Sequence, residues 1–169
     1  MTEKKIKETK ADEKEEKNEK TIKAVFANEI VYSDAKEAKD VYSKSRFGEI
    51  KEDKVIYSLV EAMYLVEKKK MDVYDGKDKL INEEEFKKRA RKIEGNFNVR
   101  YAVFKDMRDR GFIVKTALKF GADFRVYDRN VKPGEDHARW VVFPVYEAGT
   151  LTWYEWAAKN RVAHSTRKK

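Results

Sequence analysis

The chain of 169 residues contains no cysteine and only two histidines, His137 and His164. The missing thiols exclude a disulfide scaffold, a thiolate zinc site and a cysteine nucleophile. A site built from several histidines would need side chains from another chain, because metal sites in proteins use several ligands. The sequence therefore predicts chemistry that depends on neither a metal nor another cofactor.

Long apolar runs are absent as well. No stretch approaches the roughly 18 apolar residues of a membrane-spanning helix, and the N-terminus lacks the apolar segment of a signal peptide. These absences predict a soluble cytoplasmic protein with no membrane partner. Apolar residues make up 41% of the chain and charged residues another 41%, so we expect a modest core and a densely charged surface.

The net charge of +8 is unevenly distributed. Residues 1–20 carry seven lysines and seven acids, so this segment adds no net charge. Residues 111–169 hold 11 basic and 6 acidic side chains, the densest basic excess of the chain. This excess favours a polyanionic partner, although a lysine-rich solubilising surface would give the same count.

The first half of the chain predicts a tail and a small domain. Residues 1–21 are charged and almost free of apolar side chains, which predicts disorder. Residues 22–32 alternate apolar and polar positions and predict two short strands. Apolar residues recur at three and four positions in 55–66, which predicts an amphipathic helix, and Asn82 before three glutamates predicts a helix start. We therefore expect an N-terminal α+β domain over residues 22–94.

The second half predicts a helix, then strands, then a helix. The helix begins between Asn96 and Asn98 and is followed by alternating apolar positions over 112–127 and 140–145, which predict strands. The sequence becomes helical again from Thr152. A second α+β unit is therefore expected over residues 95–169, and the fold class of the whole chain is α/β of the α+β type.

One region combines ionisable groups with a strand and a turn. Tyr127 ends an alternating strand, His137 follows after the Pro133-Gly134 turn, and Lys168 lies at the far end of the last predicted helix. A phenol, an imidazole and an ammonium group around one phosphate form a metal-free set for RNA transesterification. They can supply a base, an acid and a cation for the transition state.

Each of these residues also has a structural interpretation. A strand-end tyrosine such as Tyr127 is often a core residue with its hydroxyl at the surface. His137 can be an ordinary surface histidine, and Lys168 can belong to a solvated chain end. His164 competes with His137 for the role of the acid, and the spacing does not choose between them.

Three runs of sequence resemble one known family. They are residues 101–127 (YAVFKDMRDRGFIVKTALKFGADFRVY), 136–137 (DH) and 161–169 (RVAHSTRKK). They are similar to the catalytic domain of archaeal tRNA-splicing endonucleases, the tRNA-intron lyases. The resemblance covers about the last 70 residues closely and the helical region over 59–100 more loosely.

The resemblance implies a role for four residues. Tyr127 would be the general base, His137 the general acid and Lys168 the cation that stabilises the transition state. Arg161 would stack on a base flipped out of the intron bulge, whereas His164 would have no catalytic role. The implied substrate is precursor tRNA with a bulge-helix-bulge motif, and the implied products carry a 2′,3′-cyclic phosphate and a 5′-hydroxyl.

The resemblance also implies an architecture and an assembly. The second domain would be a nuclease domain with a mixed sheet flanked by helices, working in a homo-oligomer or in a complex with a structural subunit. Family members continue beyond the position of Lys168 with further strands, so we expect either a fragment or a sheet completed by a partner. Ala117 stands where the family usually has glycine. The alternatives are a non-catalytic structural RNA-binding subunit and a generic basic RNA-binding module.

Overall fold

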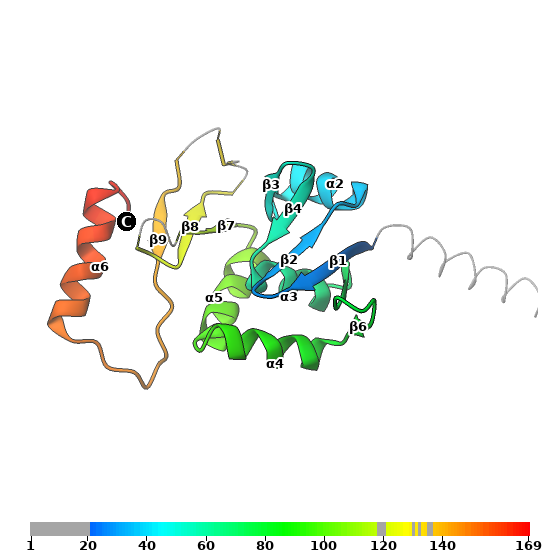
Figure 1. Cartoon of the computed structure of the whole chain (residues 1–169). Coiled ribbons are helices and arrows are strands. Elements are labelled where there is room, and N and C mark those ends of the chain that lie inside the picture. Colours follow the sequence, from blue (N-terminus) through cyan, green and yellow to red (C-terminus); the bar gives the residue numbers. More distant parts are fainter. Residues whose placement is uncertain (1–20, 118–120, 130, 132, 135–136) are drawn as a thin grey trace, which may run out of the picture. The chain divides into compact units, whose positions relative to one another are not determined.

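The computed structural model divides into two units, Met1–Lys88 and Arg89–Lys169 (Figure 1). It describes residues 21–117, 121–129, 131, 133–134 and 137–169. The tail predicted over residues 1–21 lies outside the described residues except for Thr21. None of the described helices is long and apolar enough to cross a membrane.

The first unit is built on a six-stranded sheet in the order β3-β4-β2-β1-β5-β6. Its strands are β1 (Ile22–Ala27), β2 (Ile30–Ser33), β3 (Glu49–Lys51), β4 (Lys54–Tyr57), β5 (Met71–Tyr74) and β6 (Leu80–Ile81). β1 and β5 run parallel, and the other neighbours are antiparallel. The strand pair predicted over 22–32 is confirmed, and Asn28 turns the chain with a φ of 53°, a conformation that asparagine tolerates better than most residues.

The helices of this part are α2 (Lys36–Ser45) and α3 (Leu59–Glu67), and the boundary between the units falls within α4 (Glu83–Ile93). The prediction of one helix over 55–66 is wrong at its start, because residues 55–57 belong to β4 and pair with β2. Ser58 separates strand from helix: its N–H and hydroxyl donate to Oε2 of Glu61 at 3.1 and 2.8 Å. This capping arrangement starts α3 after the strand has ended.

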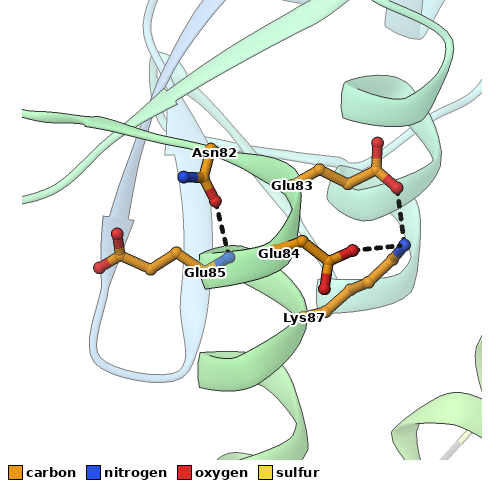
Figure 2. Close-up of polar contacts among 5 residues, drawn as sticks. All are labelled: Asn82, Glu83, Glu84, Glu85 and Lys87. Carbon is orange, nitrogen blue, oxygen red and sulfur yellow. Dashed lines mark hydrogen bonds and ion pairs between the residues drawn. The ribbon is translucent and has the colours of Figure 1, made fainter.

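The predicted helix start at Asn82 is confirmed (Figure 2). The N–H of Glu85 donates to Oδ1 of Asn82 at 2.9 Å, which satisfies one of the free donors at the beginning of α4. Nζ of Lys87 lies 2.6 Å from Oε1 of Glu83 and 3.6 Å from Oε1 of Glu84. The hydrogen bond to Glu83 raises the pKa of Lys87.

The second unit contains a three-stranded antiparallel sheet in the order β7-β8-β9. Its elements are α5 (Phe97–Asp109), β7 (Ile113–Thr116), β8 (Phe124–Tyr127), β9 (Trp140–Val142) and α6 (Trp153–Ser165). The strand predicted over 140–145 ends at Val142, because Val142 pairs with Phe124, the first residue of β8. The predicted strand positions 118–120 lie outside the described residues. The predicted mixed α+β class is confirmed.

Candidate active site

Tyr127 is the last residue of β8, the central strand of the second sheet. Tyr127 is 5% exposed, and its strand lies between β7 and β9 in the sheet. Aromatic and β-branched residues at Phe124, Val126 and Tyr127 favour a strand covered on both sides. The phenol is therefore carried by a paired strand rather than by a loop.

The beginning of β8 is anchored by a buried cation. Arg100 of α5 is 5% exposed, its Nη1 pairs with Oε2 of Glu94, and its Nε lies 2.9 Å from Oδ1 of Asp123. The guanidinium also lies over the ring of Phe124, 5.4 Å from its centroid. These contacts fix the start of β8, three residues before Tyr127, against α5.

His137 lies in the segment that leads into β9, and its side chain is exposed. Two residues later, the N–H of Arg139 donates to the carbonyl oxygen of Val126 at 3.0 Å. Nη1 of Arg139 also lies 2.8 Å from Oδ2 of Asp128, the residue after Tyr127. These two contacts hold the segment that carries His137 at the end of β8 where Tyr127 lies.

The end of α6 determines where Lys168 lies. Arg167 adopts a left-handed conformation with a φ of 53°. Its N–H donates to the carbonyl oxygen of His164 at 3.0 Å, and the N–H of Lys168 donates to that of Ala163 at 2.8 Å. This pair of bonds is the Schellman motif, which ends a helix and redirects the chain. The chain consequently turns away from the axis of α6 at Lys168.

The redirected chain runs beside β9. The N–H of Lys169 donates to the carbonyl oxygen of Arg139 at 3.1 Å, and the N–H of Val141 donates to that of Lys169 at 3.0 Å. This is the hydrogen-bond pattern of a parallel pair centred on Trp140 and Lys169. Lys168 therefore lies beside Arg139, on the side of β9 away from β8.

The register of the sheet relates Tyr127 to Lys168. Val126 pairs with Trp140, and the N–H of Arg139 donates to the carbonyl oxygen of the same Val126. Arg139 and Trp140 thus both face one residue of β8, which is the pattern of a β-bulge. The backbone of Arg139 is bonded to the end of β8 on one side and to Lys169 on the other. Neighbouring strands are about 4.8 Å apart, so the end of β8 and the chain at Lys168 are about 10 Å apart.

Arg161 lies on another element of the same unit. It is an exposed residue of α6, about two helical turns before Lys168. The neighbouring Val162 and Ala163 pack on the sheet against a small apolar cluster of Ala117, Ala122 and Val141. α6 is thereby attached to the sheet by one face, as Figure 1 shows beside β9, and Arg161 lies off that face.

Two family models match the chain, one for each unit. Residues 22–87 match the N-terminal domain of tRNA intron endonucleases, and residues 97–169 match their catalytic C-terminal domain. The chain is 48% identical to the tRNA-splicing endonuclease of Nanoarchaeum equitans over 117 residues, which cover 66% of this chain and 75% of the relative. The chain belongs to the tRNA-splicing endonuclease family.

Other archaeal members of the family are similar over more of the chain. The tRNA-splicing endonuclease of Pyrococcus abyssi is 41% identical over 148 residues, or 87% of this chain and 84% of the relative. That of Thermococcus kodakarensis is 45% identical over 128 residues, or 76% of this chain and 74% of the relative. The prediction that the chain is a tRNA-splicing endonuclease, a nuclease of tRNA processing, is confirmed.

The structure adds residues to the site that sequence reasoning did not single out. They are Arg100 and Asp123, which anchor β8, and Arg139, whose backbone bonds both the end of β8 and Lys169. Arg100 carried a usable signal, because it is a charged residue within an otherwise apolar face of a predicted helix. Among the residues that the structure describes, no three His, Asp or Glu side chains are grouped as a metal site would need.

Proposed function

We propose that this chain is an endoribonuclease that excises introns from precursor tRNA at bulge-helix-bulge motifs without a metal ion. The proposed products are a 2′,3′-cyclic phosphate and a 5′-hydroxyl. The observation that carries the proposal is the backbone bonding of Arg139, which joins the end of β8 at Val126 to the chain at Lys169, while His137 lies two residues before Arg139.

The proposed reaction is an internal displacement at phosphorus. Tyr127, as its phenolate, takes the proton of the 2′-hydroxyl, and the 2′-oxygen forms a bond to the adjacent phosphorus. His137, as imidazolium, gives its proton to the 5′-oxygen while the bond from phosphorus to that oxygen breaks. Lys168 stabilises the additional negative charge on the phosphorane oxygens. Proton exchange with water then returns both groups to their starting states.

Substrate binding is assigned to the exposed face of α6. Arg161 would stack on an unpaired base next to the cleaved bond, using the flat guanidinium plane. Its position off the sheet-facing side of α6 leaves that plane accessible. We further propose that the enzyme acts as a homo-oligomer or with a structural subunit, and that its domains comprise residues 22–94 and 95–169.

The two histidines allow a matched test. In the full chain, His137→Ala should slow single-turnover cleavage of an intron-containing precursor tRNA by at least about 100-fold, the usual contribution of a positioned acid. RNA affinity should change by no more than a few fold. His164→Ala removes the other histidine and should cleave at the wild-type rate, because the proposed reaction gives no part to His164, an exposed residue of α6.

Equal cleavage by wild type and His137→Ala would contradict the assignment of the acid. Excess EDTA should leave the wild-type rate within about twofold, and loss of cleavage on chelation would contradict the metal-free reaction. RNA binding by the wild type without any cleavage would favour a structural subunit instead. A cleaved 3′ fragment that needs dephosphorylation before a kinase can label it would exclude the proposed 5′-hydroxyl.

A further inference from the structure

The first turn of α6 carries three aromatic side chains on the surface of the second unit. Trp153 is 87% exposed, Tyr154 78% and Trp156 52%. Val145, Tyr146 and Leu151, which precede the helix, are also exposed by 40% or more. Single exposed apolar residues are ordinary, but a local group of this kind indicates a binding surface.

The geometry of an α-helix makes these aromatic rings point in different directions. A residue of an α-helix is rotated by about 100° from the one before it, so a spacing of seven residues returns to nearly the same direction. Tyr154 precedes Arg161 by seven residues and therefore lies on the same stripe, about 10 Å away along the axis. Trp156 precedes Arg161 by five residues and points about 140° away from that stripe.

The stripe is separate from the side of α6 that covers the sheet. Val162 and Ala163 define the covered side by packing on the cluster of Ala117, Ala122 and Val141. Lys159 also points toward this side, with Nζ 4.6 Å from the ring centroid of Phe143. Tyr154 and Arg161 are both exposed beside it and can be reached by a ligand without moving the helix.

Charge identifies the kind of ligand. Residues 153–169 contain five basic side chains and one acid, Glu155. The carboxylate of Glu155 is engaged at the helix start, where it accepts from the N–H and the hydroxyl of Thr152, both at 2.8 Å. A cationic helix with exposed rings fits a nucleic acid with unpaired bases, since the cations attract phosphates and the rings stack on bases.

We propose that Tyr154 is a second base-stacking position of this enzyme, two helical turns from Arg161 on the same stripe of α6. This inference rests on the proposed function, because it takes the RNA substrate as the ligand. Tyr154 stacks on an unpaired base near the one held by Arg161. The site therefore selects RNA in which more than one nucleotide is unpaired near the cleaved bond.

Binding of precursor tRNA to the full chain tests the proposal. Tyr154→Ala should weaken binding by about 5- to 150-fold, the range for losing one stacked base. Tyr154→Phe keeps the ring and should bind within about twofold of wild type. Trp156→Ala removes a half-exposed ring from the side of the same helix where Ala163, seven residues later, packs on the sheet, and it should also bind within about twofold. None of these variants should alter the helix content of the protein.

Two further measurements separate stacking from other roles. Tyr154→Ala should leave the salt dependence of binding unchanged, because a neutral ring releases no counterions, and it should not weaken binding to a fully paired RNA. An effect of Tyr154→Ala below twofold, or an equal effect of Trp156→Ala, would overturn the proposal. A change in the sedimentation mass of the RNA-free protein without a change in RNA affinity would make Tyr154 a contact between protein copies instead.

The result of the RNA-binding test of Tyr154 is independent of the result of the cleavage assay. If wild type binds RNA in a Tyr154-dependent manner but His137→Ala cleaves like wild type, the stacking position stands and the assigned acid fails. If His137→Ala abolishes cleavage while Tyr154→Ala has no effect on affinity, the proposed reaction stands and the stacking position fails.

Discussion

The two units of the molecule distribute charged and apolar side chains in opposite ways. In residues 21–88, the buried side chains are almost all apolar, and the buried acid Glu61 accepts from Ser58 and from the N–H of Gly48 at 3.0 Å. Among the described residues of 89–169, two cations are buried, Arg100 and Lys115, and six large apolar residues between 145 and 156 are exposed.

This difference indicates that the two units serve different purposes. The first unit follows the ordinary rule that apolar surface is removed from water, and its exposed Ile30, Ile50 and Leu80 are scattered along the chain. The second unit departs from this rule in two ways, because it buries cations in its interior and exposes large apolar side chains on its surface. Departures of this kind concentrate at functional sites, and in this unit they lie next to the strand that carries Tyr127 and on the helix that carries Arg161. The comparison predicts that charge matters for stability mainly in the second unit.

The largest expected effect is at the buried cation of the second unit. Arg100→Leu leaves the carboxylates of Glu94 and Asp123 beside an apolar side chain, and we expect a loss of about 3–5 kcal/mol in the free energy of unfolding. Urea denaturation followed by circular dichroism measures this loss. The expected cause is the unpaired negative charge, so adding Glu94→Gln and Asp123→Asn to Arg100→Leu should recover part of the stability.

Arg110 provides the matched control for Arg100. Arg110 directly follows α5, and its Nε lies 3.0 Å from Oδ2 of Asp106 in that helix, but its side chain is 62% exposed. Arg110→Leu should change the free energy of unfolding by no more than about 0.5 kcal/mol, as is usual for exposed pairs. Equal losses for the two variants would break the comparison, because burial would then not be what makes charge important in this unit.

A smaller effect is expected at a buried hydroxyl of the first unit. Tyr57 is fully buried, and among the described residues its hydroxyl has no hydrogen-bond partner. Burial, with a smaller contribution from Glu61, raises the pKa of Tyr57 above its ordinary value. Tyr57→Phe removes a polar group that gains nothing from burial, so it should leave stability unchanged or raise it by up to about 1 kcal/mol at neutral pH.

The sign of the pH effect follows from the raised pKa of Tyr57. The folded state favours the neutral phenol, so its contribution to stability is complete below the ordinary pKa of about 10 and is lost as the pH rises above it. In melting curves between pH 8 and 11.5, Tyr57→Phe should show a smaller decline of Tm than wild type. Tyr154→Phe, which alters an exposed tyrosine, should follow the wild-type curve. Parallel curves for Tyr57→Phe and wild type would contradict the burial argument.

Local signals made much of the fold predictable. The cap at Asn82 acts within three residues, and the turn at Asn28 joins two strands that are adjacent in the sequence. Both features are therefore predictable from the sequence alone. The predicted start of α3 is wrong because Val55 fits a helical spacing with Leu59. The β-branched residues at 55 and 56 and the Ser58 cap carry the opposing local signal, and pairing with β2 decides between them.

The site was less predictable because its decisive contacts are long-range. The strand-end position of Tyr127 followed from alternation and is confirmed. The pairing of Lys169 beside β9 and the ion pair of Arg100 with Asp123 join residues that are far apart in the sequence. Spacing along the chain holds no information about such contacts, so the roles of Tyr127, His137 and Lys168 came from a resemblance and stay predictions.

The smallest expected effect is at the exposed start of α6. The two hydrogen bonds from Thr152 lower the pKa of Glu155, so the folded state favours the carboxylate. The contribution of Glu155 to stability is therefore present above the ordinary pKa of about 4.3 and is lost as the pH falls through the lower pKa of the folded state.

Glu155→Gln should increase amide exchange only in the first turn of α6 at pH 7, and it should reduce the difference in exchange between pH 7 and pH 3. Glu147→Gln alters an acid that precedes the helix and should change neither quantity. A loss of global stability in Glu155→Gln would mean that the exposed aromatic turn supports the interior of its unit, and the division between a binding surface and a charged interior would no longer hold.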